Sequence, residues 1–435
     1  MQNLIADLRA RGLVQDITPG TEEQLLQQPT AGYIGFDPTA DSLHVGSLLP
    51  ITLLMRLQQA GHTPYALVGG ATGAIGDPSG KSAERNLLDW ETIQKNCDGI
   101  RRQLERFLDF SPQTKNHAIL VNNADWFRNV TFLDFIREAG KHITIAYMLS
   151  KESVQKRMET GLSFTEFTYQ LIQGYDFYHL HKEHGVQLQM GGADQWGNIT
   201  TGTELIRRMA AAQRQSEDEA APESFAFTCP LITKSDGTKF GKSEGGNIWL
   251  DAERTSPYRF YQFWLGLPDA DAERMAYTFS FKPVEEIASL IESHKEAPHM
   301  RALQKALAEE LTILVHGEEE LRSAVRASEI LFGKSTVEAL KSLSEKELLS
   351  AMEGVPQVQG NREGLQEGLE LVSFLAESGI VSSKGEARKL LAAGGVSINK
   401  EKASVETRLT SDQMLAEHYI LVQRGKKDYT LVIFA

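Results

Sequence analysis

The sequence predicts an α/β protein: a parallel sheet wrapped by helices, then a helical region, then a small α+β domain. The first 225 or so residues alternate short apolar runs with longer helical patterns, which is typical of a parallel sheet. From about Asp251 to Phe332 the pattern is helical, and the last segment mixes one helix with β-like runs. A length of 435 residues also fits about three domains of roughly 150 residues each.

In the first part, we expect strands over 31–36, 63–70, 116–123 and 185–192, and helices over 48–61, 91–108 and 163–180. A turn at Pro38 follows the first strand, and a helix is expected to start near His44. Ligands of parallel sheets bind beyond the carboxyl ends of the strands, where this turn lies. A helix start also suits anions. An ordinary turn with a polar cap would give the same pattern.

The later elements are predicted from polar stretches, from a loss of periodicity and from helix-capping residues. Residues 213–224 are polar and acidic, which favours a surface loop. The periodicity fails over 355–360, which suits a linker. Ser383 and Glu386 form an S-x-x-E capping box for a helix over 384–393, which Gly394 and Gly395 end. β-like runs follow over 396–399, 419–425 and 429–434.

The composition excludes several classes of protein. Hydrophobic residues make up 41% and charged residues 24%, as in globular proteins with real cores. Two cysteines, Cys97 and Cys229, cannot build a disulfide framework or a cysteine-rich zinc site, so we expect a reducing compartment. No apolar run is long enough to span a bilayer, and the polar N-terminus does not resemble a signal peptide. We therefore expect a cytoplasmic protein without a membrane partner.

The charge is unevenly distributed along the chain. The net charge is −13, from 45 basic and 58 acidic residues. From Leu365 onward there are nine of each, so the tail is neutral. A polyanionic partner would therefore need local basic patches. The tail offers two clusters, which are also ordinary for a solvated surface: Lys384, Arg388 and Lys389, and Arg424, Lys426 and Lys427.

Two stretches resemble phosphate-binding loops, over 76–82 and 237–243. Each is one residue short of the Walker A spacing, so a P-loop NTPase is disfavoured. In the second stretch, Lys239 and Lys242 stand among glycines, and mobile lysines suit phosphate chemistry. A solvated hairpin would give the same string.

The helix over 163–180 carries Tyr169, Gln173 and Asp176 at spacings of four and three. Such spacings put three side chains on one face of a helix. A solvated polar face is the alternative, but tyrosine is a poor choice for one.

Five ordered motifs then resemble those of bacterial tyrosyl-tRNA synthetases, which are class I aminoacyl-tRNA synthetases. They are YIGFDPTADSLHVG, GDPSGK, SFTEFTYQLIQGYDF, GGADQWGNI and DGTKFGKSEGGNIW. His44-Val45-Gly46 and the segment 239–243 match the HIGH and KMSKS signatures of that class. The resemblance covers nearly the whole chain and implies a ligase that activates L-tyrosine with ATP and transfers it to tRNA(Tyr).

The resemblance implies a role for each matching site residue. Residues expected to bind ATP are Gly35, Asp37, Thr39, His44, Gly46, Ser47, Gly192, Asp194, Lys239, Lys242 and Ser243. Thr39, His44, Lys239 and Lys242, with Lys81 and Arg85 at the leaving pyrophosphate, are expected to be catalytic. Ser47 stands where the family usually has histidine. Mg²⁺ would accompany ATP without a dedicated protein cage, and no tightly bound cofactor or protein-held metal is expected.

For the amino acid, the resemblance assigns Tyr169, Gln173 and Asp77 to the ammonium and Tyr33 and Asp176 to the phenol. Gln195, with Gly192 and Asp194, would line the ribose and the amino-acid end. A related enzyme that activates tryptophan is a rival interpretation, but an indole has no phenol for Tyr33 and Asp176. A non-catalytic RNA-binding protein is a second rival, and the intact segment 239–243 speaks against it.

The same resemblance implies a domain organisation. It consists of a Rossmann-like catalytic domain over 1–225 with a dimer-interface insertion near 125–160, a helical anticodon-binding-type domain with the KMSKS-type loop over 226–332, a linker region over 333–364, and a small RNA-binding domain over 365–435. We therefore expect a homodimer whose tail binds tRNA.

Overall fold

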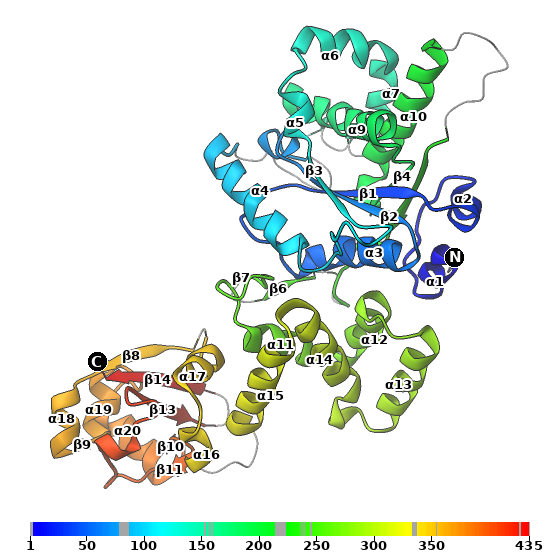
Figure 1. Ribbon diagram of the computed structural model, residues 1–435. Helices are drawn as coiled ribbons and strands as arrows, with labels where there is room; N and C mark the ends of the chain where they lie inside the picture. Colours follow the sequence, from blue (N-terminus) through cyan, green and yellow to red (C-terminus); the bar gives the residue numbers. More distant parts are fainter. Residues whose placement is uncertain are drawn as a thin grey trace. The chain divides into compact units, whose positions relative to one another are not determined.

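The computed structural model forms two compact units (Figure 1). Unit 1 comprises Met1–Asp251 and Leu267–Leu307, and unit 2 comprises Ala252–Gly266 and Ala308–Ala435. The structure describes residues 3–77, 87–151, 154–155, 158–159, 161–213, 223–235, 237, 240–243, 246–332, 337–353, 355–425 and 428–434. The predicted loop over 213–224 lies largely outside these ranges.

Unit 1 is built on a five-stranded sheet in which every neighbouring pair is parallel. In spatial order its strands are β3 (Ile119–Asn122), β2 (Thr63–Val68), β1 (Ala31–Phe36), β4 (Leu188–Gly192) and β5 (Phe225–Cys229). The predicted parallel sheet is thus confirmed, although β5 was not among the predicted strands. The chain order reverses between β1 and β4, and such a switch point opens a crevice at the carboxyl ends of the two strands.

Helices cover both faces of this sheet, with α3 and α4 on one side and α9 and α10 on the other (Figure 1). The α-helices of unit 1 are α1 (Leu4–Ala10), α2 (Thr21–Gln27), α3 (Leu48–Gln59), α4 (Trp90–Leu104), α5 (Ala124–Phe127), α6 (Phe132–Glu138), α7 (Ile145–Leu149), α9 (Phe164–His184), α10 (Trp196–Gln213), α12 (Asp269–Phe279) and α13 (Val284–Glu296). The 3-10 helices are η1 (Val45–Ser47), η2 (Thr72–Ala74), η3 (Gly140–His142), η4 (Ala193–Gln195) and η5 (Pro298–Met300), and a hairpin joins β6 (Lys242–Ser243) to β7 (Gly246–Asn247). The three predicted long helices correspond to α3, α4 and α9.

The boundaries of α9 have clear local causes. Ser163 and Glu166 form a reciprocal capping box at its start, which satisfies two otherwise unpaired backbone donors. Gly185 adopts a left-handed conformation with φ 67° and ends the helix. One face of α9 enters the core of unit 1 through side chains such as Leu171, Phe177 and Leu180. This packing fixes the direction in which the polar face of α9 points.

Unit 2 contains a second five-stranded sheet, in the order β11 (Glu401–Lys402), β10 (Val396–Ile398), β13 (Tyr419–Arg424), β14 (Asp428–Phe434) and β8 (Gln357–Gly360). Its neighbours are antiparallel except β14 and β8, which are parallel. Strands β9 (Leu369–Glu370) and β12 (Arg408–Leu409) form a separate pair. The core includes Leu371, Leu375, Ile420, Val432 and Phe434.

The helices of unit 2 are α11 (Pro257–Leu265), α15 (Glu318–Phe332), α16 (Val337–Lys341), α17 (Glu345–Ala351), α18 (Arg362–Glu367), α19 (Leu371–Glu377), α20 (Lys384–Ala392) and the 3-10 helix η6 (Ser411–Gln413). Helix α14 (Ala302–His316) begins in unit 1 and ends in unit 2. The two units therefore do not coincide with the predicted boundaries at 225 and 332.

Two local predictions for unit 2 need correction. The predicted linker over 333–364 contains α16, α17 and β8 among its described residues, and β8 pairs with β14. The four residues of β8 alternate between exposed and half-buried, and this pattern is too short to be recognised as a periodicity in the sequence. The predicted capping box is only half formed: Ser383 accepts from the Glu386 backbone, but the Glu386 carboxylate accepts from Ser382.

Candidate active site

A pocket of about 290 Å³ opens at the carboxyl ends of β1 and β4, as expected for a switch point. Ten residues that the sequence analysis singled out line it: Tyr33, Gly35, Asp37, Thr39, Asp77, Tyr169, Gln173, Asp176, Gly192 and Gln195. They come from β1 and the turn after it, from the segment after η2, from α9, and from β4 and η4. The fold thus brings together residues from four separate stretches of the chain.

A carboxyl and a phenolic hydroxyl form the buried end of this pocket. Asp176 is 2% exposed; its Oδ2 accepts from Nδ2 of Asn123 at 3.0 Å, and its Oδ1 accepts from Nε1 of Trp126 at 2.9 Å. Tyr33 is 1% exposed, and its hydroxyl has no hydrogen-bond partner among the residues that the structure describes. Because buried polar groups normally pair, this end of the pocket suits a ligand group that can donate and accept a hydrogen bond.

Burial controls the ionisation of both groups. It raises the pKa of Asp176 to about 8, although the hydrogen bonds from Asn123 and Trp126 lower it. Burial and the charge of Asp176 raise the pKa of Tyr33 well above its usual value. At pH 7 the carboxyl of Asp176 is therefore largely protonated, and a ligand that donates a hydrogen bond to it favours the ionised form.

A second polar group surrounds Asp37, directly after β1. The Tyr169 hydroxyl donates to Oδ2 of Asp37 at 2.9 Å, and the Thr72 hydroxyl donates to Oδ1 at 2.8 Å. Burial and the charges of Asp37 and Asp77 raise the pKa of Tyr169 well above its usual value. Since the hydroxyl of Tyr169 gives its proton to Asp37, its oxygen offers lone pairs to any further partner.

A chain of side-chain amides continues from Tyr169 along the pocket wall. Nδ2 of Asn198 donates to Oε1 of Gln173 at 2.9 Å, and Nε2 of Gln173 donates to Oε1 of Gln195 at 3.2 Å. Nε2 of Gln195 then donates to Oδ2 of Asp77 at 2.7 Å. The acceptor oxygens of Tyr169, Gln173 and Asp77 thus line one pocket, which suits a cation such as an ammonium group.

The polar cap at the start of η1 explains the pairing of a histidine with a glycine two residues later. Nδ1 of His44 accepts from the backbone N–H of Gly46 at 3.0 Å, so the proton of the neutral ring is on Nε2, a hydrogen-bond donor. A Cβ at position 46 would lie 2.7 Å from Cε1 of His44. Only glycine leaves room for the ring here. The backbone N–H of the half-buried Ser47 donates to the carbonyl of His44 at 2.7 Å.

The segment after β7 lies against the same turn. The backbone N–H of Val45 donates to the carbonyl of Ile248, and that of Leu250 donates to the carbonyl of Leu43, both at 2.9 Å. Gly241, at φ 87°, approaches Gly46 so closely that a Cβ would lie 3.2 Å from the Gly46 nitrogen. The two predicted signature motifs, about 195 residues apart, are therefore neighbours in unit 1.

Of the other residues predicted to contact the nucleotide or its phosphates, some lie within the described residues and some do not. Lys81, Arg85 and Lys239 lie outside the described residues. Lys242 and Ser243 are described as the backbone of β6, paired with β7. Asp194 lies in η4, directly after β4.

Four residues of this site were missed by the sequence analysis: Thr72, Asn123, Trp126 and Asn198. Each forms a hydrogen bond to a predicted residue. Asn198 stands within the quoted motif GGADQWGNI but was not assigned a role there. Asn123 ends the predicted strand over 116–123, where parallel sheets carry functional side chains, and this position is the signal that could have identified it.

The basic residues proposed for nucleic acid lie in unit 2. Arg388 and Lys389 are exposed on α20, Lys384 pairs with Glu377 at 3.0 Å, and Arg424 lies 3.7 Å from Asp428. Lys426 and Lys427 lie outside the described residues. Pairing with acids lowers the net charge that Lys384 and Arg424 present, so Arg388 and Lys389 are the more available cations.

The described residues contain neither a metal-ion site nor a membrane-spanning helix. Among them, no group of three or more His, Cys, Asp or Glu side chains is arranged to hold a metal ion. No helix in the same ranges is long and apolar enough to cross a membrane.

Comparison with known proteins agrees with this geometry. Residues 25–333 match the family model described as tRNA synthetases class I (W and Y), and residues 347–432 match a tyrosine–tRNA ligase C-terminal domain. The chain is 55% identical to a tyrosine–tRNA ligase of Flavobacterium johnsoniae over 436 residues and 56% identical to one of Bacteroides fragilis over 437 residues. Each comparison covers 99% of both chains.

A solved structure is similar as well. The truncated mitochondrial tyrosyl-tRNA synthetase of Aspergillus nidulans superposes with a TM-score of 0.67 at 32% identity, covering 76% of this chain and 95% of that one.

Proposed function

The chain belongs to the tyrosine–tRNA ligases, within the class I tRNA synthetases, and on this premise we propose roles for its site residues. The enzyme activates L-tyrosine with ATP to tyrosyl-adenylate and pyrophosphate, and then transfers the tyrosyl group to the 3′ end of tRNA(Tyr). The single observation that carries the assignment of the pocket is the buried pair of Tyr33 and Asp176.

Tyr33 and Asp176 recognise the phenol of tyrosine. The phenol donates to the Asp176 carboxylate, whose two oxygens already accept from Asn123 and Trp126, and it accepts from the Tyr33 hydroxyl. Phenylalanine would leave these buried groups unpaired, and that penalty gives the selectivity. Tyrosyl-tRNA synthetases are the standard example of this selectivity rule. The part of the proposal that is specific to this chain is the identity of the two partners of the phenol, Tyr33 and Asp176.

Tyr169, Gln173 and Asp77 hold the ammonium group. Tyr169 and Gln173 accept through oxygens whose orientation is fixed by Asp37 and Asn198, and Asp77 supplies a negative charge. Together with Gln195, which donates to Asp77, they align the amino acid so that its carboxylate faces the mouth of the pocket, next to Gly35, Thr39 and Gly192.

Activation requires no covalent bond to the enzyme. A carboxylate oxygen of tyrosine attacks the α-phosphorus of ATP, and the bond from that phosphorus to the pyrophosphate oxygen breaks. The nucleotide binds along Asp37, Gly46, Ser47 and Asp194. Thr39, His44, Lys239, Lys242 and Ser243 contact the phosphates, with Lys81 and Arg85 at the leaving pyrophosphate. Orientation and stabilisation of developing charge supply the rate enhancement.

The Nε2 proton of His44 supports its role, because it gives the phosphates a neutral donor at a helix start. Mg²⁺ enters as part of the MgATP substrate, since ATP phosphates and water supply most of its octahedral ligands.

The tRNA is held in part by the tail. We assign the small RNA-binding domain to the C-terminal region whose sheet includes β8 as well as β10, β11, β13 and β14, so that it begins before the predicted start at residue 365. Arg388 and Lys389, which are exposed on α20, contact phosphates together with Lys384, Arg424, Lys426 and Lys427. Since the whole chain carries −13, these local contacts must offset an unfavourable long-range field.

The enzyme acts as a homodimer in the cytoplasm. Large apolar side chains stand exposed on α6, α7 and the start of α9: Phe132 (65%), Leu133 (70%), Ile145 (67%) and Phe164 (69%). Helix α6 contains no buried residue at all. A patch of this kind marks a protein interface, and it overlaps the predicted interface region near 125–160. The two cysteines are buried and unpaired, as suits a reducing compartment.

Amino-acid-dependent exchange between ATP and pyrophosphate tests the proposed pocket. We expect exchange with tyrosine and at most trace exchange with the other nineteen amino acids, tryptophan and phenylalanine included. Exchange with tryptophan at a comparable kcat/KM would contradict the assignment of Tyr33 and Asp176 to a phenol.

A further inference from the structure

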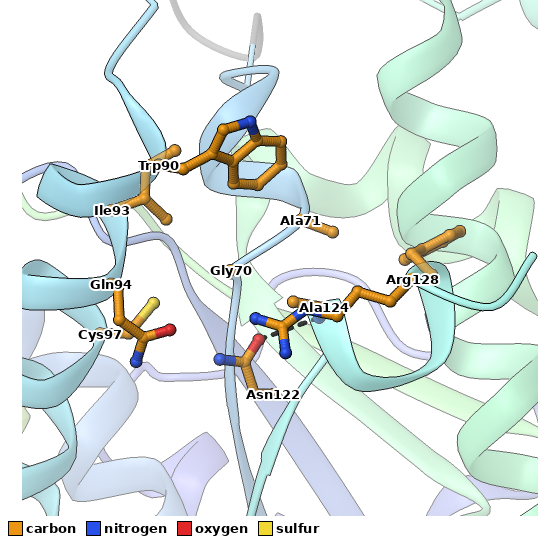
Figure 2. Close-up of a pocket in the computed structure, with 10 residues that line it drawn as sticks. Gly70, Ala71, Trp90, Ile93, Gln94, Cys97, Asn122, Ala124 and Arg128 are labelled. Atoms are coloured by element: carbon orange, nitrogen blue, oxygen red, sulfur yellow. Dashed lines mark hydrogen bonds between the residues drawn. The ribbon is translucent and has the colours of Figure 1, made fainter.

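A second cavity, of about 500 Å³, lies in unit 1. Figure 2 shows the residues that line it. The cavity shares no lining residue with the tyrosine pocket. The turn after β2 and the end of β3 separate the two pockets. A hydrogen bond of 2.7 Å from the backbone N–H of Ala71 to Oδ1 of Asn123 joins this turn to the end of β3. Asn122 lines the second cavity, whereas Asn123 holds Asp176 on the other side.

The walls of this cavity are mainly apolar and aromatic. Ile93, Phe127 and Ala71 contribute to them, and the indole of Trp90 stands at the cavity 69% exposed. An aromatic ring exposed at the edge of a hollow is available for stacking on a planar ligand. Small-molecule sites typically enclose about 300–1,000 Å³, with apolar walls and a few convergent polar groups.

The polar groups of the cavity define the ligand chemistry. The Arg128 side chain extends into the cavity (Figure 2) and has no hydrogen-bond or ion-pair partner among the described residues. Oδ1 of Asn122 is occupied by the backbone N–H of Ala124 at 2.9 Å, which leaves Nδ2 as a donor. Both groups therefore offer hydrogen-bond donors, and Arg128 adds a positive charge.

No described lining residue carries a negative charge. The lining contains neither Asp nor Glu, and burial raises the pKa of the Cys97 thiol to about 11, so this thiol is neutral at pH 7. An ammonium group would meet at most a neutral acceptor, Oε1 of Gln94, whose Nε2 donates to Asp98 at 3.1 Å. A carboxylate would meet the charge of Arg128 and the amide of Asn122.

We propose that this cavity is a second ligand site, which binds a planar aromatic acid. The ring stacks on Trp90 between the apolar walls, and the carboxylate accepts hydrogen bonds from Arg128 and from Nδ2 of Asn122. The site is independent of the tyrosine pocket, because the two linings have no residue in common.

The test is calorimetric titration of the full-length enzyme with 2-naphthoate in saturating L-tyrosine, which blocks the active site. Two matched probes carry the same ring: 2-naphthylmethanol lacks the charge, and L-2-naphthylalanine adds an ammonium group. We expect one 2-naphthoate per chain and at least about tenfold weaker binding of both other probes, since hydrogen bonds to a charged carboxylate are stronger than neutral ones and only 2-naphthoate offers a carboxylate without an ammonium group.

Variants locate the site. Arg128→Gln and Trp90→Ala should each weaken 2-naphthoate about tenfold and leave tyrosine activation without the probe unchanged. Arg102→Gln, an exposed arginine on α4 outside the lining, is the matched control and should bind as the wild type does. Thermal melting of each variant verifies that it is folded.

Four binding results would each overturn the proposal. They are the absence of 2-naphthoate binding at millimolar concentration, displacement of the probe by tyrosine, full affinity in both Arg128→Gln and Trp90→Ala, and equal affinity for L-2-naphthylalanine. A shift of either variant from dimer to monomer in sedimentation would likewise overturn it, because the cavity would then belong to a subunit interface.

Discussion

Replacing Asp176 with asparagine should make the enzyme more stable at neutral pH and less stable in acid. Burial raises the pKa of Asp176 from 3.8 to about 8, so between these values the folded state binds a proton that the unfolded state does not. Stability therefore falls as pH rises through this window. At about 1.36 kcal/mol per pKa unit, the ionisable carboxyl costs the folded state about 4 kcal/mol at pH 7 and very little at pH 4.

Asparagine removes this cost but introduces another. Its amide can accept from only one of Asn123 and Trp126, and leaving a buried donor unpaired costs about 1–3 kcal/mol. The Asp176→Asn variant should thus be more stable than the wild type by about 1–3 kcal/mol at pH 7 and less stable by about 1–3 kcal/mol at pH 4. The reversal of sign, more than either value, identifies the buried carboxyl as the cause.

Urea unfolding followed by tryptophan fluorescence measures this difference, since four of the five tryptophans lie in unit 1. Midpoints of wild type and variant are compared from pH 4 to pH 8 without tyrosine, so that other titrating groups cancel. Asp125→Asn, at an exposed carboxyl, is the matched control and should show no reversal. A difference between Asp176→Asn and wild type that stays constant across this range would refute the reasoning.

Three further predictions concern activity and assembly. The ratio of kcat/KM for tyrosine to that for phenylalanine should rise from pH 6 to pH 8, because the phenol donates to ionised Asp176, whose pKa is about 8 before tyrosine binds; a flat ratio would contradict this. Lys242→Ala should lower the rate of tyrosine activation far more than the affinity for tyrosine, as expected for a group that acts on the transition state; equal losses would indicate a structural role. Leu133→Asp, on the exposed face of α6, should shift the dimer towards monomers in sedimentation, whereas unchanged association would exclude α6 from the interface.

Much of the catalytic fold could be predicted from the sequence because its signals are local. β1 to β4 are short apolar runs between turns, and α3, α4 and α9 are long helical segments. The spacing of Tyr169, Gln173 and Asp176 also sufficed to place them on one face. The strand β8 was not predicted, because its signal is not local. Its four residues alternate in exposure, and they form a strand only when β14 supplies the hydrogen bonds.

The environment of Asp176 could not be predicted from the sequence. Its complete burial raises the pKa of Asp176 to about 8, far above the usual value for an aspartate. Burial depends on contacts between distant segments, here β3, α5 and α9. For the same reason Asn123 and Trp126 were missed, because their roles exist only once α9 packs against the end of β3.

The central claim, that the buried pair of Tyr33 and Asp176 recognises the phenol, is tested most directly by kcat/KM for tyrosine and phenylalanine in pyrophosphate exchange. Tyr33→Phe removes one neutral hydrogen-bond partner, worth roughly 0.5–1.5 kcal/mol, so selectivity should fall by about tenfold or less while activity with tyrosine is largely kept. Asp176→Ala removes the charged acceptor and should be close to inactive. If both variants keep the wild-type ratio and the wild-type rate, the phenol is recognised elsewhere and the account is wrong.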